Sequence, residues 1–288
     1  MLDITPFEIP LAKWVETLVA YLSDNFGAFF DAIAAFILYL YNLVELLFQT
    51  PPSWLMLLIF IILAWRLSGW KFAVFTAAGL WLLDNLGLWQ HTMSTMSLVL
   101  SAVVIAVVIG LPTGIASARY QFLSQALRPV LDFMQTLPAF VYLIPAIIFF
   151  GLGTVPAIMS TIIFAMPPVI RFTELGIRQV PEDVIEAALA FGSTSNQLLF
   201  KVQLPMSMPT IMAGINQTIM LSLSMVVIAS MIGAGGLGDD VLRAITQLEV
   251  GLGFEGGIGI VILAIILDRL TRALVKGGEQ INSGSLSR

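Results

Sequence analysis

Long apolar segments separated by short polar connections make up most of this 288-residue chain. After Pro51 and Pro52, apolar runs typical of membrane spans recur to the end of the sequence. We place them at residues 53–67, 72–88, 94–118, 131–150, 155–171, 209–232 and 256–274. Crossing the hydrocarbon core of a bilayer takes about 20 residues, so the first two runs are slightly short. The pattern predicts an all-α integral membrane protein with about seven transmembrane helices.

Residues 1–50 follow a different pattern, in which apolar side chains recur every three or four positions. The apolar positions are Leu11, Trp14, Val15, Leu18, Val19, Leu22 and Phe26. This spacing predicts an amphipathic helix. Asp31 and Glu45 belong to a polar stripe in the following segment, and such charges disfavour a span that faces lipid. We expect residues 1–50 to form N-terminal amphipathic interfacial helices along the membrane; the alternative is one more span with its polar stripe facing the bundle.

Composition excludes several classes of function. The chain is 58% hydrophobic and 11% charged, whereas soluble domains carry about 25% charged residues. The sequence contains no run of basic residues of the kind that binds nucleic acid. The absence of cysteine excludes disulfides and thiolate metal sites. The single histidine, His91, excludes a two-histidine metal motif and is interpreted as a residue of a short polar connection.

The distribution of basic residues predicts the orientation of the chain. With seven spans, eleven of the thirteen lysines and arginines fall on one side of the membrane, and Lys13 and Arg243 fall on the other. The basic side is the cytoplasmic one. The loop at residues 175–208 and the tail at 277–288 are therefore expected in the cytoplasm, and residues 1–50 outside. An eighth span would move only Lys13, so the charge count leaves both arrangements open.

The loop at residues 175–208 carries helix start and stop signals. Pro181 suits the first position of a helix, and Gly192 suits the position after its end, where the backbone often needs a positive φ. Ser193, Thr194 or Ser195 can then cap a second short helix, which we expect Pro205 to stop. The signals predict a helix–turn–helix between two membrane segments.

Catalytic motifs are missing from the sequence. None of the lysines follows a glycine, so a Walker A phosphate-binding loop cannot be written. A chain with one histidine offers no credible Ser/His/Asp arrangement. We expect no enzyme activity and no cofactor in this chain, and ATP, if it drives the protein, must be bound by another polypeptide.

The loop also contains a spaced set of residues: Glu186, Ala187, Ala188, Gly192, Leu204 and Pro205. Their spacing resembles the cytoplasmic coupling loop of ABC importer permeases, although that family usually has Ile where Val202 stands. The stretches 132–145, 208–217 and 235–238 make the chain similar to the permease subunits of glycine betaine/proline betaine importers. The resemblance extends over residues 93–276.

This resemblance implies a MetI-like type I permease core of five helices at residues 93–276, preceded by a transmembrane hairpin at 51–92. It also implies that two copies of the chain pair around a translocation path in a bacterial or archaeal cytoplasmic membrane. Each copy would bind one ABC ATPase subunit through its coupling loop, and an external substrate-binding protein would deliver the solute. ATP would be bound by the ATPase and would drive alternating access.

Side chains that could line such a path are polar or aromatic residues within the spans. The candidates are Phe140, Tyr142, Asn216, Gln217, Ser222 and Ser224. Polar groups in membrane helices face the bundle or a water-filled cavity, and aromatic faces attract quaternary ammonium ions. Packing between helices explains the polar residues equally well, and it is the better explanation for each aromatic residue taken singly. The competing functions are an ABC permease for another solute, an ion-coupled secondary transporter with Asp84 as its main intramembrane acid, and a structural scaffold.

Overall fold

The computed structural model describes residues 10–285, with side chains described as far as Ala273. Within these residues the chain is helical and forms no strand. The helices are α1 (Leu11–Gln49), α2 (Ser53–Ser68), α3 (Trp70–Asn85), α4 (Trp89–Arg119), α5 (Gln121–Thr136), α6 (Ala139–Phe150), α7 (Thr154–Ala165), α8 (Pro167–Arg178), α9 (Glu182–Ala190), α10 (Ser195–Leu198), α11 (Leu204–Ser230), α12 (Leu237–Gln247) and α13 (Val250–Ser285). The predicted all-α class is confirmed.

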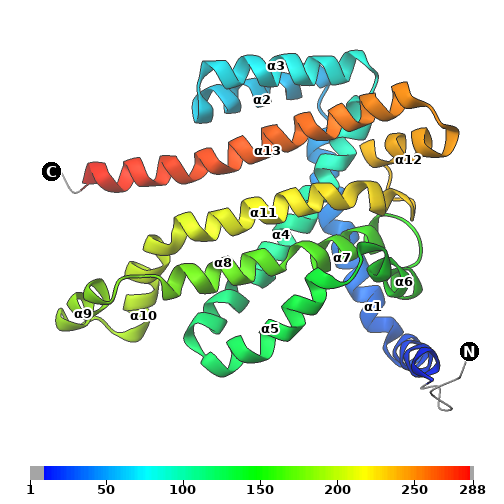
Figure 1. The fold of residues 1–288 in the computed structure, drawn as a ribbon. Helices are drawn as coiled ribbons and strands as arrows, with labels where there is room; N and C mark the ends of the chain where they lie inside the picture. Colours follow the sequence, from blue (N-terminus) through cyan, green and yellow to red (C-terminus); the bar gives the residue numbers. More distant parts are fainter. Residues whose placement is uncertain (1–9, 286–288) are drawn as a thin grey trace, which may run out of the picture.

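Five stretches of helix in the described part are long and apolar enough to cross a membrane. They are α1, α4, α7 with α8, α10 with α11, and α13. The bent pair α5 and α6 would make a sixth. The predicted seven spans correspond to these without α1 and with α2 and α3 added. α2 and α3 each have 16 residues and are about 24 Å long. These two helices pack against each other as a hairpin along one side of α13 (Figure 1).

α4 is the helix around which the others pack, and it contributes to both apolar cores. Its Met93 and Met96 belong to one core with Leu83 of α3 and Leu263 of α13. Further along, α4 takes part in a second core made with α1, α7 and α11. α4 also contacts α8, which lies between it and α11. The helical arrangement thus depends on one long helix that is buried on several faces.

Small residues let α8 approach its two neighbours closely. A Cβ on Gly114 of α4 would lie 2.6 Å from Cβ of Thr173, and one on Gly214 of α11 would lie 2.7 Å from Cβ of Phe172. Helices in membranes commonly associate through such small residues, because dispersion contacts increase when backbones come together. The hydroxyl of Thr218 on α11 also donates a hydrogen bond to the carbonyl oxygen of Ala165 on α7, at 2.8 Å.

α1 is one helix of 39 residues with a break in its dihedral angles at Phe26. Its second half packs on α4, α6 and α7, and buries Ile37 and Tyr41. In Figure 1 α1 crosses behind the bundle at a steep angle to α11 and α13. By length and composition α1 qualifies as a span, but its direction differs from theirs. Whether residues 1–50 lie along the membrane therefore stays a prediction, and residues 1–9 lie outside the described part.

The span predicted at residues 131–150 is wrong as a single helix. α5 ends at Thr136, α6 begins at Ala139, and their axes meet at 99°. Leu137 and Pro138 have ψ values of 136°, which are extended rather than helical. Proline disfavours the helical region for the residue before it and cannot donate to the preceding turn, so the helix breaks here.

Candidate coupling loop and translocation face

α9 has both of the end signals that the sequence predicts, with a shift of one residue at its start. Pro181 occupies the N-cap rather than the first helical position, and Glu182 and Asp183 stand in the first turn. At the other end Gly192 has φ 81°. Its N–H donates to the carbonyl of Leu189 at 2.9 Å, and the N–H of Ser193 donates to that of Ala188 at 3.1 Å. This pair of bonds is a Schellman motif, which satisfies carbonyls that a helix end leaves free.

α10 is short, and both its own cap and α4 fix its position. The hydroxyl of Thr194 accepts the backbone N–H of Gln197, whose side-chain oxygen accepts the N–H of Thr194. This reciprocal capping box satisfies two N–H groups at the helix start. Arg119, at the end of α4, donates to the hydroxyl of Ser195 at 2.9 Å. Thr194 is one of the three predicted caps, while the contact from Arg119 joins positions too far apart for sequence reasoning to find.

The expectation that Pro205 stops this helix is wrong. A π-helical turn at Leu199–Gln203 follows α10 and leads directly into α11, where Pro205 is in the first turn. The N–H of Leu204 donates to the carbonyl of Leu199, five residues back. In a π-helical turn each carbonyl accepts the N–H five residues later instead of four. This shift in the hydrogen-bond pattern lets a proline, which has no N–H, enter the helix here without the usual break.

The loop presents an apolar tip that is open to solvent in this chain. No residue of α9 is buried, and Phe191, immediately after it, is 92% exposed. Leu189 is 51% exposed, and Glu186 and Ala187 are also exposed. An aromatic residue next to a helix-ending glycine in a polar loop is the signal that could have identified Phe191. Exposed apolar side chains at the tip of a capped loop make it a candidate docking surface.

The candidate residues of α11 lie on different faces of the helix. Gln217 and Ser224 are exposed, two turns apart, and Met220 lies exposed between them. Ser222 is fully buried, and its hydroxyl has no hydrogen-bond partner among the described residues. Asn216 borders a cavity of about 820 Å³ between the α2–α3 turn, α11 and α13, which Asp268 and Arg269 also line. The structure therefore brings Gln217 and Ser224 together, but not Ser222.

The two candidates on α6 are also separated. Phe140 is 53% exposed, on the same side as Ile144 and Ile148, which are exposed as well. Tyr142 is 7% exposed. Its hydroxyl lies 2.6 Å from the carbonyl oxygen of Met134 and 3.1 Å from that of Phe133, both on α5. Tyr142 thus contacts the neighbouring helix rather than an open face.

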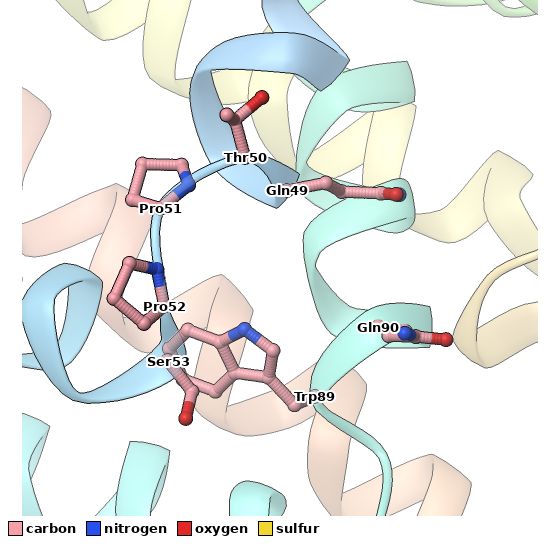
Figure 2. A pocket seen from close by; sticks show the side chains of 7 residues that line it. All are labelled: Gln49, Thr50, Pro51, Pro52, Ser53, Trp89 and Gln90. Atoms are coloured by element: carbon pink, nitrogen blue, oxygen red, sulfur yellow. The ribbon is translucent and has the colours of Figure 1, made fainter.

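A further hollow, of about 330 Å³, lies near the start of α4. Figure 2 shows its lining side chains around the α1–α2 turn and the first turn of α4. They are Gln49, Thr50, Pro51, Pro52, Ser53, Trp89 and Gln90. None of these side chains is charged, so the hollow contains no fixed charge for an ion.

His91 is not in a loop, as the sequence suggested, but in the first turn of α4. Its Nδ1 lies 2.6 Å from a carboxylate oxygen of Asp240 on α12, a residue that is 3% exposed. Next to this pair, the backbone N–H of Leu237 donates to the hydroxyl of Thr95 at 2.8 Å. A polar cluster around the buried carboxylate of Asp240, in which the His91 side chain is 41% exposed, therefore attaches α12 to α4.

Comparisons with known proteins agree with this geometry. Residues 106–277 match the family model described as binding-protein-dependent transport system inner membrane component. The chain is 52% identical to the glycine betaine transport system permease protein OpuAB of Bacillus subtilis (strain 168), over 92% of this chain and 94% of that protein. It is 50% identical to the glycine betaine/proline betaine transport system permease protein ProW of Escherichia coli (strain K12), over 92% and 75% respectively.

The fold also has a counterpart among solved structures. An inward-facing structure of the MetNI methionine ABC transporter contains a chain that superimposes with a TM-score of 0.57. The match covers 69% of this chain and 96% of that one, at 22% identity. At this identity the likeness concerns the fold, which is the type I permease core.

Proposed function

Because this chain belongs to the family of binding-protein-dependent transport system inner membrane components, we propose that it is the permease of an ATP-driven betaine importer. Its substrates are glycine betaine and proline betaine, and a separate ABC ATPase binds and hydrolyses the ATP. The observation that carries the substrate class is identity of 50% or more to two betaine permeases over 92% of this chain. Two copies of the chain pair in the cytoplasmic membrane, and an external binding protein delivers the betaine.

The coupling loop supplies the contact with the ATPase in this proposal. Its caps make it rigid without burying it, so its exposed tip can enter a groove on a partner and transmit a displacement to α11. Glu186, Ala187, Ala188 and Gly192 form the docking side, and Leu204 and Pro205 connect the loop to the membrane helix. Closure of the ATPases would shift the bundle between two arrangements, provided that ATP binds one arrangement more tightly than the other.

The exposed faces of α6 and α11 give the path its chemistry. Phe140, Gln217 and Ser224 offer an aromatic face and small dipoles, and none of them is charged. A quaternary ammonium has no N–H to donate, so aromatic faces are its suitable contacts, worth up to about 2 kcal/mol when desolvated. A fixed carboxylate would bind the cation too tightly for release. A path whose side chains bind the cation weakly therefore suits a betaine.

Uptake into reconstituted vesicles tests the substrate and the energy source together. We expect uptake of glycine betaine that requires internal ATP, the ATPase and the binding protein, and that persists when proton and sodium gradients are collapsed. Uptake that depends on an ion gradient and ignores ATP would instead place the chain among secondary transporters. ATP-dependent uptake of another solute, without betaine uptake, would contradict the substrate class alone.

The orientation of the loop is tested by labelling, since the chain has no native cysteine. Cysteine at Ser195 should be protected from an impermeant thiol reagent in intact cells, and cysteine at Asp239 should react. The reverse result would contradict a cytoplasmic coupling loop. Glu186→Lys and Gly192→Val test its role, because the valine resists the positive φ. Both variants should insert normally and lose ATP-driven uptake; normal uptake by both would remove the loop from the mechanism.

A further inference from the structure

The bend between α5 and α6 leaves the carbonyl of Met134 without its usual donor. In a continuous α-helix the carbonyl of Met134 would accept the backbone N–H four residues later. That residue is Pro138, which has no N–H. The hydroxyl of Tyr142, in the first turn of α6, lies 2.6 Å from this carbonyl oxygen. The phenol thus supplies the donor that the proline lacks, and it does so from the other side of the bend.

α5 is the more loosely packed of the two helices at the bend, since it buries only Ser124 and Leu131, whereas α6 packs on α1 and α7. Beyond its chain neighbours, α5 is attached to α8 mainly by polar contacts: Ser124 donates to Glu174 at 2.7 Å, and Asp132 pairs with Arg171 at 2.5 Å. Several of its large apolar side chains are exposed, including Phe133 at 61%. The side chains of the Asp132–Arg171 pair are 64% and 42% exposed, and exposed pairs add little stability. The part-buried hydrogen bond from Tyr142 therefore adds a direct constraint across the bend to the packing of α6 on its other neighbours.

The bend angle sets the position of the exposed face of α6. This helix has 12 residues and is about 18 Å long, so a rotation of about 10° at the bend moves its far end by about 3 Å. Phe140, Ile144 and Ile148 are on the exposed side of α6, whereas Tyr142 is on the buried side. A change at Tyr142 would therefore move this face without altering any side chain on it.

We infer that Tyr142 is a positioning residue for transport: its hydroxyl replaces the N–H that Pro138 lacks, fixes the angle between α5 and α6, and so places the exposed face of α6. Tyr142 need not touch the transported solute. This inference rests on the proposed function insofar as α6 lines the path. The geometry of the bend itself does not depend on what is transported.

The matched variants are Tyr142→Phe and Tyr120→Phe. Each removes one oxygen, but Tyr120 is 59% exposed, and its hydroxyl makes no hydrogen bond within the described residues. Spin labels on cysteines at Gln125 and Ile148 report the separation of α5 and α6 in the assembled transporter. Tyr142→Phe should shift the population away from the bent arrangement about 2–10-fold, as loss of one neutral hydrogen bond predicts. Tyr120→Phe should leave the distances unchanged.

The transport measurement separates positioning from general stability. Tyr142→Phe should lower the number of betaine molecules imported per ATP hydrolysed, by about 2–10-fold. A merely structural defect would reduce uptake and hydrolysis in proportion and keep that ratio. The inference would be overturned if Tyr142→Phe and Tyr120→Phe gave the same spin-label distances and the same ratio of betaine imported to ATP hydrolysed. It would also be overturned if the Tyr142→Phe chain failed to assemble. If the wild-type vesicles import no betaine, the proposed function fails, and the spin-label distances still decide the role of Tyr142.

Discussion

The α12 end of the bundle and the α9–α10 loop achieve a defined shape by opposite means. At the α12 end, Asp240 is 3% exposed and pairs with His91. Leu237 is fully buried, and its backbone N–H donates a hydrogen bond to the hydroxyl of Thr95. In the loop, no residue of α9 is buried, and local caps define the turn. One region is therefore stabilised by burial of contacts between distant segments, and the other by hydrogen bonds between residues a few positions apart.

This difference suits the two regions to different tasks. The α12 end resists displacement, because opening it exposes apolar surface and leaves the buried carboxylate of Asp240 without its partner. A capped but exposed loop keeps its apolar tip available, and it can move as a unit with the helix that follows it. The comparison predicts that substitutions at the α12 end change the stability of the whole bundle, while those in the loop change association and local opening.

The largest effect is expected for His91→Ala, which leaves the carboxylate of Asp240 buried without its partner. Only the Asp240 side of the pair is buried, since the His91 side chain is 41% exposed. Leaving a buried polar group without its partner costs about 1–3 kcal/mol, and more when the group is charged. We expect a clear fall in the thermal unfolding midpoint of the purified permease in detergent. Asp239→Asn is the matched control, because Asp239 pairs with Arg243 at the surface, and such pairs contribute about 0–1 kcal/mol.

The double variant His91→Ala/Asp240→Ala sharpens this test. Since the second change removes the stranded carboxylate, the double variant should be destabilised by less than the sum of the two single changes. Additive effects, or equal midpoints for His91→Ala and Asp239→Asn, would contradict the view that this pair stabilises the α12 end.

Phe191→Ala should weaken association with the ATPase and leave the bundle intact. Phe191 is 92% exposed, so truncation creates no cavity in this chain. Aromatic anchors at the centre of an interface cost about 2 kcal/mol or more when truncated, which is about a 30-fold loss of affinity. Affinity for the ATPase is measured with the permease in nanodiscs, and Phe200→Ala, at another exposed phenylalanine, serves as the control. Equal affinities for the two variants would show that Phe191 is not the anchor.

The same comparison explains how much could be predicted from the sequence. The end of α9 at Gly192 is a local feature that the sequence predicts, and the cap at Thr194 is one of the three candidates that it offers. The His91–Asp240 pair joins residues 149 positions apart, and nothing near His91 in the sequence reports it. The break between α5 and α6 was missed because the apolar run at 131–150 outweighed Pro138 in the pattern. The contact between the Tyr142 hydroxyl and the carbonyl of Met134 was missed as well, because it exists only where the bend brings α6 back to α5.

Thr194→Ala should have the smallest effect, confined to the loop. The change removes the side-chain acceptor of the capping box, and loss of such a cap costs about 1 kcal/mol. Because α10 buries no residue, the unfolding midpoint of the bundle should stay unchanged. Amide hydrogen exchange at Gln197 should instead rise about 5-fold, as a loss of about 1 kcal/mol in local stability predicts. Ser193→Ala, whose side chain caps nothing in the described structure, is the control. A lowered midpoint for Thr194→Ala would mean that the loop is coupled to the core of the bundle, and that its shape does not depend on local caps alone.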